Sequence, residues 1–361
     1  MNRSKEIDFL KGIAVLLVVF FHFPVIAGID KMGWIGVDLF FVLSGFLVSG
    51  LLFKEYLRHG KVDAKRFLIR RGFKIYPLFY LFMAVTFIVR LCFHESFTVK
   101  ETVGELLFVR NYTGGYWAHT WSLSVEEHFY FLLVFGVLFM VKNNLMQRPK
   151  LISRSFIVIM VLCLCVRIIN SIVESRIGSN ALFNPWARYV HTHFRIDSLL
   201  FGVLLSYHYH LNKERFVNFV SGKRKFLLPL CVCCILPAAL LDKEGIFIST
   251  IGYSLLYLGF GALLLYFITD NAMQAKLEKV FSSQVVQMIS YVGIYSYSIY
   301  IWHVFVREYF IRQMDGIWGL NKNVEFVVYV IVSLVFGIFL SKYVEFYFIK
   351  IRDRFFPSFT V

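Results

Sequence analysis

The chain has 361 residues, of which 58% are hydrophobic and 17% are charged, and its mean hydropathy is +0.66. Soluble globular domains carry about 25% charged residues, so this composition excludes an ordinary soluble protein and indicates a membrane protein. The formal net charge of +15 does not indicate nucleic-acid binding, because the basic residues lie in short loops between apolar stretches, as the positive-inside rule describes.

Ten mainly apolar stretches are candidates for transmembrane helices, which need about 20 residues each. In a bilayer the backbone groups must be hydrogen-bonded within the span, so these stretches are expected to be helical. The predicted spans are 8–27, 34–53, 75–94, 121–141, 155–173, 193–210, 226–241, 248–269, 285–304 and 324–343.

The distribution of basic residues predicts the orientation of the chain. Of the 38 Lys and Arg residues, 26 lie in the two tails and the even-numbered loops, which predicts that both termini are cytoplasmic. The short apolar run 102–109 is expected in an external loop. We therefore predict an all-α fold, a polytopic membrane helix bundle of about ten transmembrane helices. A single domain is expected over 1–361, with its core at 8–345 and no appended soluble domain.

The first predicted span carries two basic side chains on one face. Lys11 and His22 are eleven residues apart, which is close to three whole helical turns and a rise of about 16 Å. Asp8 lies near the same face. A lone histidine on an apolar helix is more often structural, but its alignment with Lys11 and Asp8 favours a functional imidazole inside the bundle. Ionisable residues within spans are costly and mark functional sites or buried pairs.

The second predicted span carries one acidic residue among apolar ones. Asp38 is a candidate partner of His22 or a wall of the site. Gly45 and Ser49 are spaced as a small-residue pair, which favours close packing of two membrane helices. Asp38 is therefore the functional candidate of this span.

A basic group lies where the chain re-enters the membrane before the third span. It consists of Arg70, Arg71 and Lys74. Two interpretations remain open at this point. These charges either fix the topology or form a phosphate clamp, because Arg binds phosphate in a bidentate manner and Lys acts as a point charge.

Three later spans also carry polar residues. Glu126 and Glu127 enter the fourth span, where one is expected to face inward and the other the interface. Arg195 and Asp197 lie at the outer end of the sixth span and are expected to pair with each other. The ninth span places hydroxyl groups, including that of Tyr300, ahead of His303. The two His-x-His pairs lie at opposite ends of one span without a companion carboxylate motif, and the six cysteines show no zinc-ligand spacing, so no metal site is predicted.

Six motifs occur in the order typical of one family. They are the Lys11-x10-His22 spacing, GWIGVDLFFVLSGFL, RRGFKIYP, WSLSVEEHFY, FRIDSLLFG and YSIYIWH. With ten predicted spans around them, the sequence resembles the acyltransferase 3 family of membrane O-acyltransferases over about 8–345. The resemblance implies transfer of an acyl group, typically acetyl from acetyl-CoA, to carbohydrate hydroxyls outside the cytoplasmic membrane of a bacterium.

The resemblance also implies roles for individual residues. It implies His22 as the catalytic histidine, Lys11 in place of the usual Arg, and Arg70, Arg71 and Lys74 as the basic motif on the CoA side. Lys stands at positions 11 and 74 where Arg is typical, so charge is kept but bidentate geometry is lost. Some members carry a hydrolase-like domain; none is expected here, so a final transfer step would need a partner protein.

The expected mechanism places the CoA phosphates at the basic cluster and the thioester near His22. His22 is predicted to act as a general base, oriented by Asp38 or Glu126, with an acyl-histidine intermediate as the variant. The predicted substrate contacts are Trp121, Ser122, Arg195, Asp197, Tyr300 and His303. The expected partners are a carbohydrate or lipid-linked glycan, membrane lipids, and polysaccharide-biosynthesis proteins or a second copy of the chain.

Three alternatives remain open from the sequence. A multi-span transporter or flippase also buries ionisable residues in its spans, although no matching halves or paired broken helices are evident. A non-catalytic subunit of a polysaccharide machine would tolerate changes at His22. Within the enzymatic interpretation, N-acylation or transfer of a longer group such as succinyl are the nearest rivals.

Overall fold

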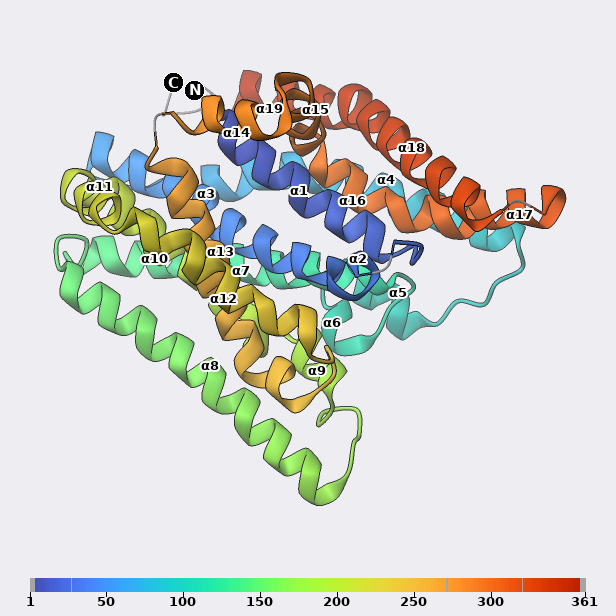
Figure 1. The fold of residues 1–361 in the computed structure, drawn as a ribbon, viewed down its shortest axis with the longest axis horizontal. Coiled ribbons are helices and arrows are strands. Elements are labelled where there is room, and N and C mark those ends of the chain that lie inside the picture. The colour runs from blue at the N-terminus through green and yellow to red at the C-terminus, as the bar shows by residue number, and fades with distance from the viewer. Residues whose placement is uncertain (1–3, 27, 271, 320, 358–361) are drawn as a thin grey trace.

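The computed structural model describes residues 4–26, 28–270, 272–319 and 321–357, and these residues contain helices but no β-strand (Figure 1). The predicted all-α class is confirmed. The α-helices are α1 Lys5–Phe21, α2 Ile29–Met32, α3 Gly36–His59, α4 Ala64–Cys92, α5 Val99–Leu106, α6 Arg110–Thr113, α7 Trp121–Lys142, α8 Pro149–Ile177, α9 Pro185–Val190, α10 Thr192–Leu211, α11 Lys213–Gly222, α12 Leu227–Leu240, α13 Tyr253–Ile268, α14 Met273–Phe281, α15 Ser283–Ile294, α16 Ser296–Phe305, α17 Arg312–Trp318, α18 Lys322–Leu340 and α19 Phe346–Phe355. The 3-10 turns are η1 Gly33–Ile35, η2 Ala118–Thr120 and η3 Arg224–Phe226, and the π-helical segments are η4 Ile248–Gly252, η5 Val306–Ile311 and η6 Ser341–Glu345.

Each of the ten predicted spans overlaps a helix. Among the described residues, six helical segments are long and apolar enough to cross a membrane: Gly33–His59, Ala64–Cys92, Ala118–Lys142, Pro149–Ile177, Ile248–Ile268 and Lys322–Phe355. The count of ten and the side of the termini stay predictions. One detail was wrong: the stretch 285–304 is not one helix, because α15 ends at Ile294 and α16 begins at Ser296. The run 102–109 overlaps α5, which has eight residues.

Glycines allow the inner helices to pack closely. A Cβ atom on Gly45 of α3 would collide with the Leu199 carbonyl of α10, so the predicted packing role of Gly45 is confirmed. Gly293 of α15 meets the Asp8 carbonyl of α1 in the same way. These close approaches hold α1 against α15 and α3 against α10, which fixes the helices that surround the site.

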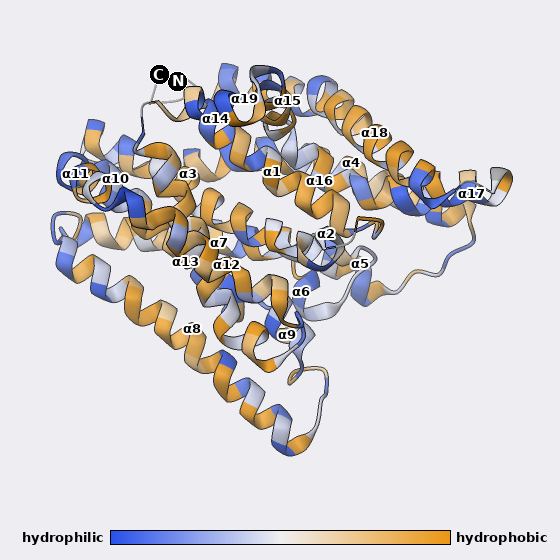
Figure 2. Cartoon of the chain, viewed as in Figure 1, coloured by the Kyte–Doolittle hydropathy of each residue, from blue (hydrophilic) through white to orange (hydrophobic). Residues whose placement is uncertain are grey.

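The periphery is apolar where lipid would lie. Figure 2 shows hydrophobic residues along the outward surfaces of α8 and α18, and Leu162 and Ile169 of α8 are 56% and 58% exposed. Both marked termini lie near α14 and α19 at one end of the molecule, whereas α17 lies at the opposite end (Figure 1). The arrangement supports a helix bundle with an apolar outer surface.

Candidate active site

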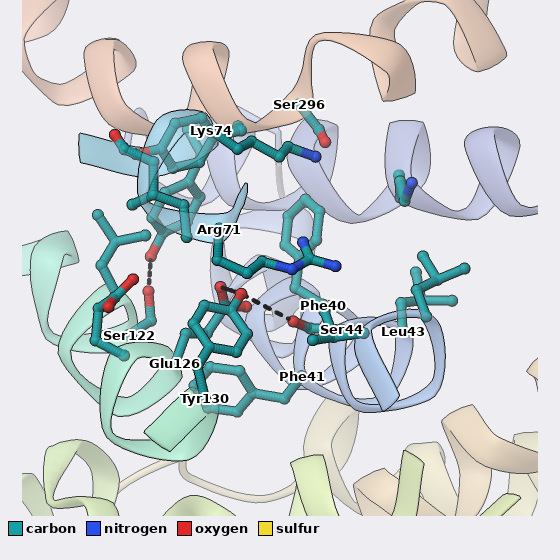
Figure 3. A pocket seen from close by; sticks show the side chains of 18 of the residues that line it. Phe40, Phe41, Leu43, Ser44, Arg71, Lys74, Ser122, Glu126, Tyr130 and Ser296 are labelled. Carbon is teal, nitrogen blue, oxygen red and sulfur yellow. Dashed lines mark hydrogen bonds between the residues drawn. The ribbon is translucent and has the colours of Figure 1, made fainter. Parts of the chain in front are cut away.

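A cavity of about 310 Å³ lies among α1, α3, α4, α7, α15 and α16 (Figure 3). We call it the basic cavity, after its three basic side chains, those of Lys11, Arg71 and Lys74; three carboxylates, Glu126, Glu127 and Glu345, also line it. The basic side chains come from α1 and α4, so helices distant in sequence deliver them to one space. Its volume falls in the range of small-molecule sites, about 300–1,000 Å³.

The basic motif predicted from the sequence is divided between two places. Arg71 reaches across the cavity, with its guanidinium 5.8 Å from the centre of the Tyr130 ring (Figure 3). Arg70 turns toward the C-terminal helix α19, where it forms an ion pair of 3.0 Å with Asp353 and donates a hydrogen bond to the Phe356 carbonyl. Of the two arginines, only Arg71 lines the basic cavity among the described residues.

Carboxylates form one wall of the cavity. Tyr130 donates a hydrogen bond of 2.9 Å to Glu126, and Tyr76 donates one of 3.0 Å to Glu127. Both glutamates line the cavity, so the expectation that one of them faces the interface was wrong. The hydrogen bond of Glu126 to Tyr130, rather than to His22, also removes the basis for Glu126 as the group that orients the imidazole.

Two hydroxyl groups lie at the end of the basic cavity that is nearest to the histidine residues described below. The oxygens of Tyr300 and Ser122 lie 2.6 Å apart, and Tyr300 donates a hydrogen bond of 2.8 Å to the His119 carbonyl. Both side chains line the cavity, and their contact with substrate stays a prediction. Behind them lie three imidazole rings, with His119 and His303 centred 5.6 and 5.7 Å from the Tyr300 ring.

His22, His119 and His303 form a group that we call the histidine cluster. Nδ1 of His303 lies 2.7 Å from the Tyr300 carbonyl, and a carbonyl only accepts, so this nitrogen carries the proton. Nε2 of His303 therefore carries a lone pair. It lies 3.2 Å from Nδ1 of His22, which also lies 2.9 Å from the Val18 carbonyl and is the donor to both. Nε2 of His22 is left as the basic nitrogen.

His119 was missed at the sequence level. It lies in the 3-10 turn η2, and its Nε2 lies 3.0 Å from the Ile301 carbonyl. Its buried Nδ1 has no hydrogen-bond partner among the described residues. The available signal was its position two residues before the WSLSVEEHFY motif, at the end of a span that faces the same region as His22 and His303.

Glu105 of α5, which lies outside the predicted spans, is hydrogen-bonded to the 3-10 turn η2 and its flanking residue. It accepts hydrogen bonds from the Thr120 hydroxyl at 3.1 Å and the Trp117 amide at 3.2 Å. Burial raises the pKa of the Glu105 carboxyl to about 7, and the nearby Arg110 guanidinium opposes that rise. Glu105 thus ties α5 to the turn that carries His119.

Asp38 and the outer residues of the sixth span belong to a separate ion-pair cluster. Asp38 pairs with Arg195 at 2.6 Å, and Asp197 pairs with Arg167 at 2.7 Å, with all four side chains fully buried. Two predictions were therefore wrong: Asp38 does not orient His22, and Arg195 does not pair with Asp197.

Aromatic rings enclose the ion-pair cluster. The Arg195 guanidinium lies 3.9 Å from the centre of the Tyr253 ring and 5.9 Å from that of Trp121. Among the described residues that line the basic cavity, neither Trp121 nor any member of the two ion pairs is found. Arg167 was not singled out from the sequence. The available signal in the sequence was the position of this arginine within the long apolar run of α8.

The described residues contain no group of three potential metal ligands, and the six cysteines are free thiols. The fold and the site define a polytopic helical membrane protein whose basic cavity ends against a histidine cluster. The chain belongs to the acyltransferase 3 family, because the family described as "Acyltransferase domain" matches residues 4–342.

The chain is similar to proteins named as O-acetyltransferases. Peptidoglycan O-acetyltransferase OatA of Listeria monocytogenes is 28% identical over 326 residues, which cover 82% of this chain and 48% of that protein. O-acetyltransferase OatA of Staphylococcus aureus is 25% identical over 329 residues, which cover 85% of this chain and 51% of that protein. The chain thus spans about half the length of the curated relatives it matches. No solved structure matches it.

Proposed function

We propose that this chain transfers an acetyl group from acetyl-CoA to a hydroxyl of a carbohydrate outside the cytoplasmic membrane of a bacterium. Family membership and the names of the two relatives support this activity. The observation that carries the proposal is the basic cavity, which begins at Lys11, Arg71 and Lys74 and ends at two hydroxyls that cover the histidine cluster.

The donor would lie along the basic cavity. Arg71, Lys11 and Lys74 supply positive charge for the phosphates of CoA, and the guanidinium of Arg71 offers two parallel donors to one phosphate. The acyl thioester would extend past Ser122 and Tyr300, so these two side chains must move apart for the thioester to reach His22. We expect Arg70 to contribute less than Arg71 to the binding of CoA, because the Arg70 guanidinium forms an ion pair with Asp353 of α19.

His22 would act as the general base. Its Nε2 removes the proton of the sugar hydroxyl as the oxygen attacks the thioester carbonyl carbon. The carbon–sulfur bond then breaks, and the departing CoA thiolate takes the proton from the imidazolium. The products are an acetyl ester and CoA thiol. His303 accepts from Nδ1 of His22 and thereby holds the ring in the tautomer that exposes a basic Nε2.

The test is substitution of the base. In membranes that contain equal amounts of protein, His22→Ala is expected to lower acetyl ester in surface glycans by at least about a hundredfold, within the usual range for a general base. His59→Ala, which changes an exposed histidine at the end of α3, is the matched control. Ester content is measured as acetate released by alkali. Wild-type ester in the His22→Ala strain would refute the mechanism.

A further inference from the structure

The last long helix of the chain continues well past its apolar part. The segment Lys322–Phe355 runs through α18, η6 and α19 as one helical stretch of 34 residues. At 1.5 Å per residue it is about 51 Å long, whereas the hydrocarbon core of a bilayer is about 30 Å thick. The predicted span 324–343 accounts for that core. We therefore expect α19 beyond it, at the end of the molecule where both marked termini lie (Figure 1).

One face of this helix points away from the bundle and changes character along its length. Tyr343 and Tyr347 on this face are 67% and 59% exposed. The face runs from an aliphatic side chain through aromatic rings to basic groups, which is the order that a helix meets as it leaves the hydrocarbon for an anionic headgroup region. We call this face the outer stripe, and its exposed members, spaced three or four residues apart, are Val335, Phe339, Tyr343, Tyr347, Lys350 and Arg354.

The opposite face of the helix is held against the protein. Asp353 of α19 pairs with Arg70 of α4, and the ring of Phe356 lies 6.0 Å from that of Phe73. Glu345 of η6 is buried and lines the basic cavity. These contacts fix the rotation of the helix, so the outer stripe stays directed away from the bundle.

The two cations of the outer stripe lack an acidic partner. Asp353 is the only acidic residue of α19, and it pairs with Arg70 and Arg352. Within the part of the chain that the structure describes, neither Lys350 nor Arg354 forms an ion pair. Residues four apart are neighbours on a helix, and like charges in these positions repel each other. A ligand with negative charge would relieve this repulsion.

The remainder of the outer stripe identifies the kind of anion. A free anion would account for the two cations but not for the exposed rings that precede them, where those of Phe339 and Tyr343 lie 4.6 Å apart. Tyrosine rings collect at the level of lipid headgroups, and basic groups just beyond a transmembrane helix attract anionic lipids. A ligand with both a phosphate and hydrocarbon chains matches both parts of the outer stripe.

We propose that the outer stripe binds an anionic phospholipid in the leaflet on the side of the termini. Its phosphate lies at Lys350 and Arg354, and its acyl chains lie along Val335 and Phe339. The proposal goes beyond the proposed acetyl transfer and does not depend on it, since the lipid is a bound partner and not a substrate.

The test is lipid titration of the purified full chain by native mass spectrometry, with phosphatidylglycerol as the anionic lipid and phosphatidylcholine as the neutral one. The double variant Lys350→Gln with Arg354→Gln is expected to raise the Kd for phosphatidylglycerol about thirtyfold, or about fivefold for each charge removed. The matched control is Lys100→Gln with Lys322→Gln, which removes two exposed charges outside the outer stripe and should bind as wild type does. Elution in size-exclusion chromatography verifies that each variant is folded.

Each other outcome overturns a stated part of the proposal. Unchanged affinity in the Lys350 and Arg354 variant would place anionic lipid elsewhere, and an equal loss in the control would mean that net charge alone attracts the lipid. Equal affinity of wild type for the two lipids would remove the role of the charges. Displacement of phosphatidylglycerol by an equal concentration of inorganic phosphate would make the ligand a free phosphate. None of these readouts involves acyl transfer, so they leave the proposed function untouched.

Discussion

The ion-pair cluster and the histidine cluster are both built from ionisable side chains within the bundle, but their surroundings differ. In the ion-pair cluster, Asp38 and Asp197 each have a buried arginine within 2.7 Å, and aromatic rings enclose the group. The histidine cluster lies instead next to Tyr300, which lines the basic cavity, and it leaves a basic nitrogen on His22. An ionisable residue inside the bundle therefore indicates a functional site only where it lies close to a cavity.

The largest expected effect is a loss of folded protein when the ion-pair cluster, but not the histidine cluster, is substituted. Arg195→Ala leaves the Asp38 carboxylate buried without its partner, which typically costs about 3–5 kcal/mol. We expect little folded Arg195→Ala protein in the membrane, whereas His22→Ala should accumulate normally. Fluorescence-detected size-exclusion chromatography of detergent extracts measures both.

The control for that experiment replaces the whole pair with apolar groups. Buried ion pairs exchanged for hydrophobic residues of similar size are often as stable as the original, so Asp38→Leu with Arg195→Met should restore folded protein. If the double variant is folded and also inactive while it binds acetyl-CoA normally, the ion-pair cluster takes part in chemistry and the contrast drawn above fails.

The next effect concerns the orientation of His22. His303→Ala removes the acceptor of the Nδ1 proton, and we expect kcat to fall by about a hundredfold with the KM for acetyl-CoA unchanged, within the range of general-base contributions. His303→Gln retains an acceptor oxygen at the end of its side chain and should recover part of kcat. Equal losses in the two variants would show that His303 acts by packing alone.

A smaller effect is expected at the donor phosphates. Arg71→Ala should raise the KM for acetyl-CoA about tenfold, since one charged hydrogen bond contributes about 1.5–3 kcal/mol. The same variant should leave the KM for S-acetylpantetheine unchanged, because that donor lacks the nucleotide phosphates. Arg70→Ala is the matched control, since its guanidinium binds α19. A larger effect at Arg70 than at Arg71 would move the phosphates out of the basic cavity.

Much of the site followed from local sequence pattern. Hydropathy located helices at all ten predicted spans, and several residues singled out from the sequence line one cavity. They are Lys11, Arg71, Lys74, Ser122, Glu126 and Tyr300, and Glu127 is a seventh. Local pattern suffices for these residues because span length and helical periodicity decide which side chains enter the bundle.

The partners of the buried charges could not be predicted in the same way. Asp38 pairs with a residue 157 positions away, and Arg167 pairs with one on another helix. Such pairs depend on which helices pack together, and close approaches such as that of Gly45 to α10 decide the packing. The break between α15 and α16, and the position of His119 in a 3-10 turn, also depend on neighbouring helices rather than on hydropathy.

The smallest expected effect lies outside the membrane spans, at Glu105. Its pKa in the folded protein is about 7, above the usual value near 4.3 for glutamate. The folded state therefore holds a proton that the unfolded chain has lost, and stability falls as the pH rises from about 4.3 to 7. Glu105→Gln removes this titration while it keeps a hydrogen-bond acceptor for Thr120. Its thermal unfolding temperature in detergent should equal that of wild type at pH 4 and exceed it by a few degrees at pH 8. A lower value at pH 8 would instead show that the ion pair with Arg110 outweighs the cost of burying the charge, so that this support of the histidine cluster, like the ion-pair cluster, depends on matched charges.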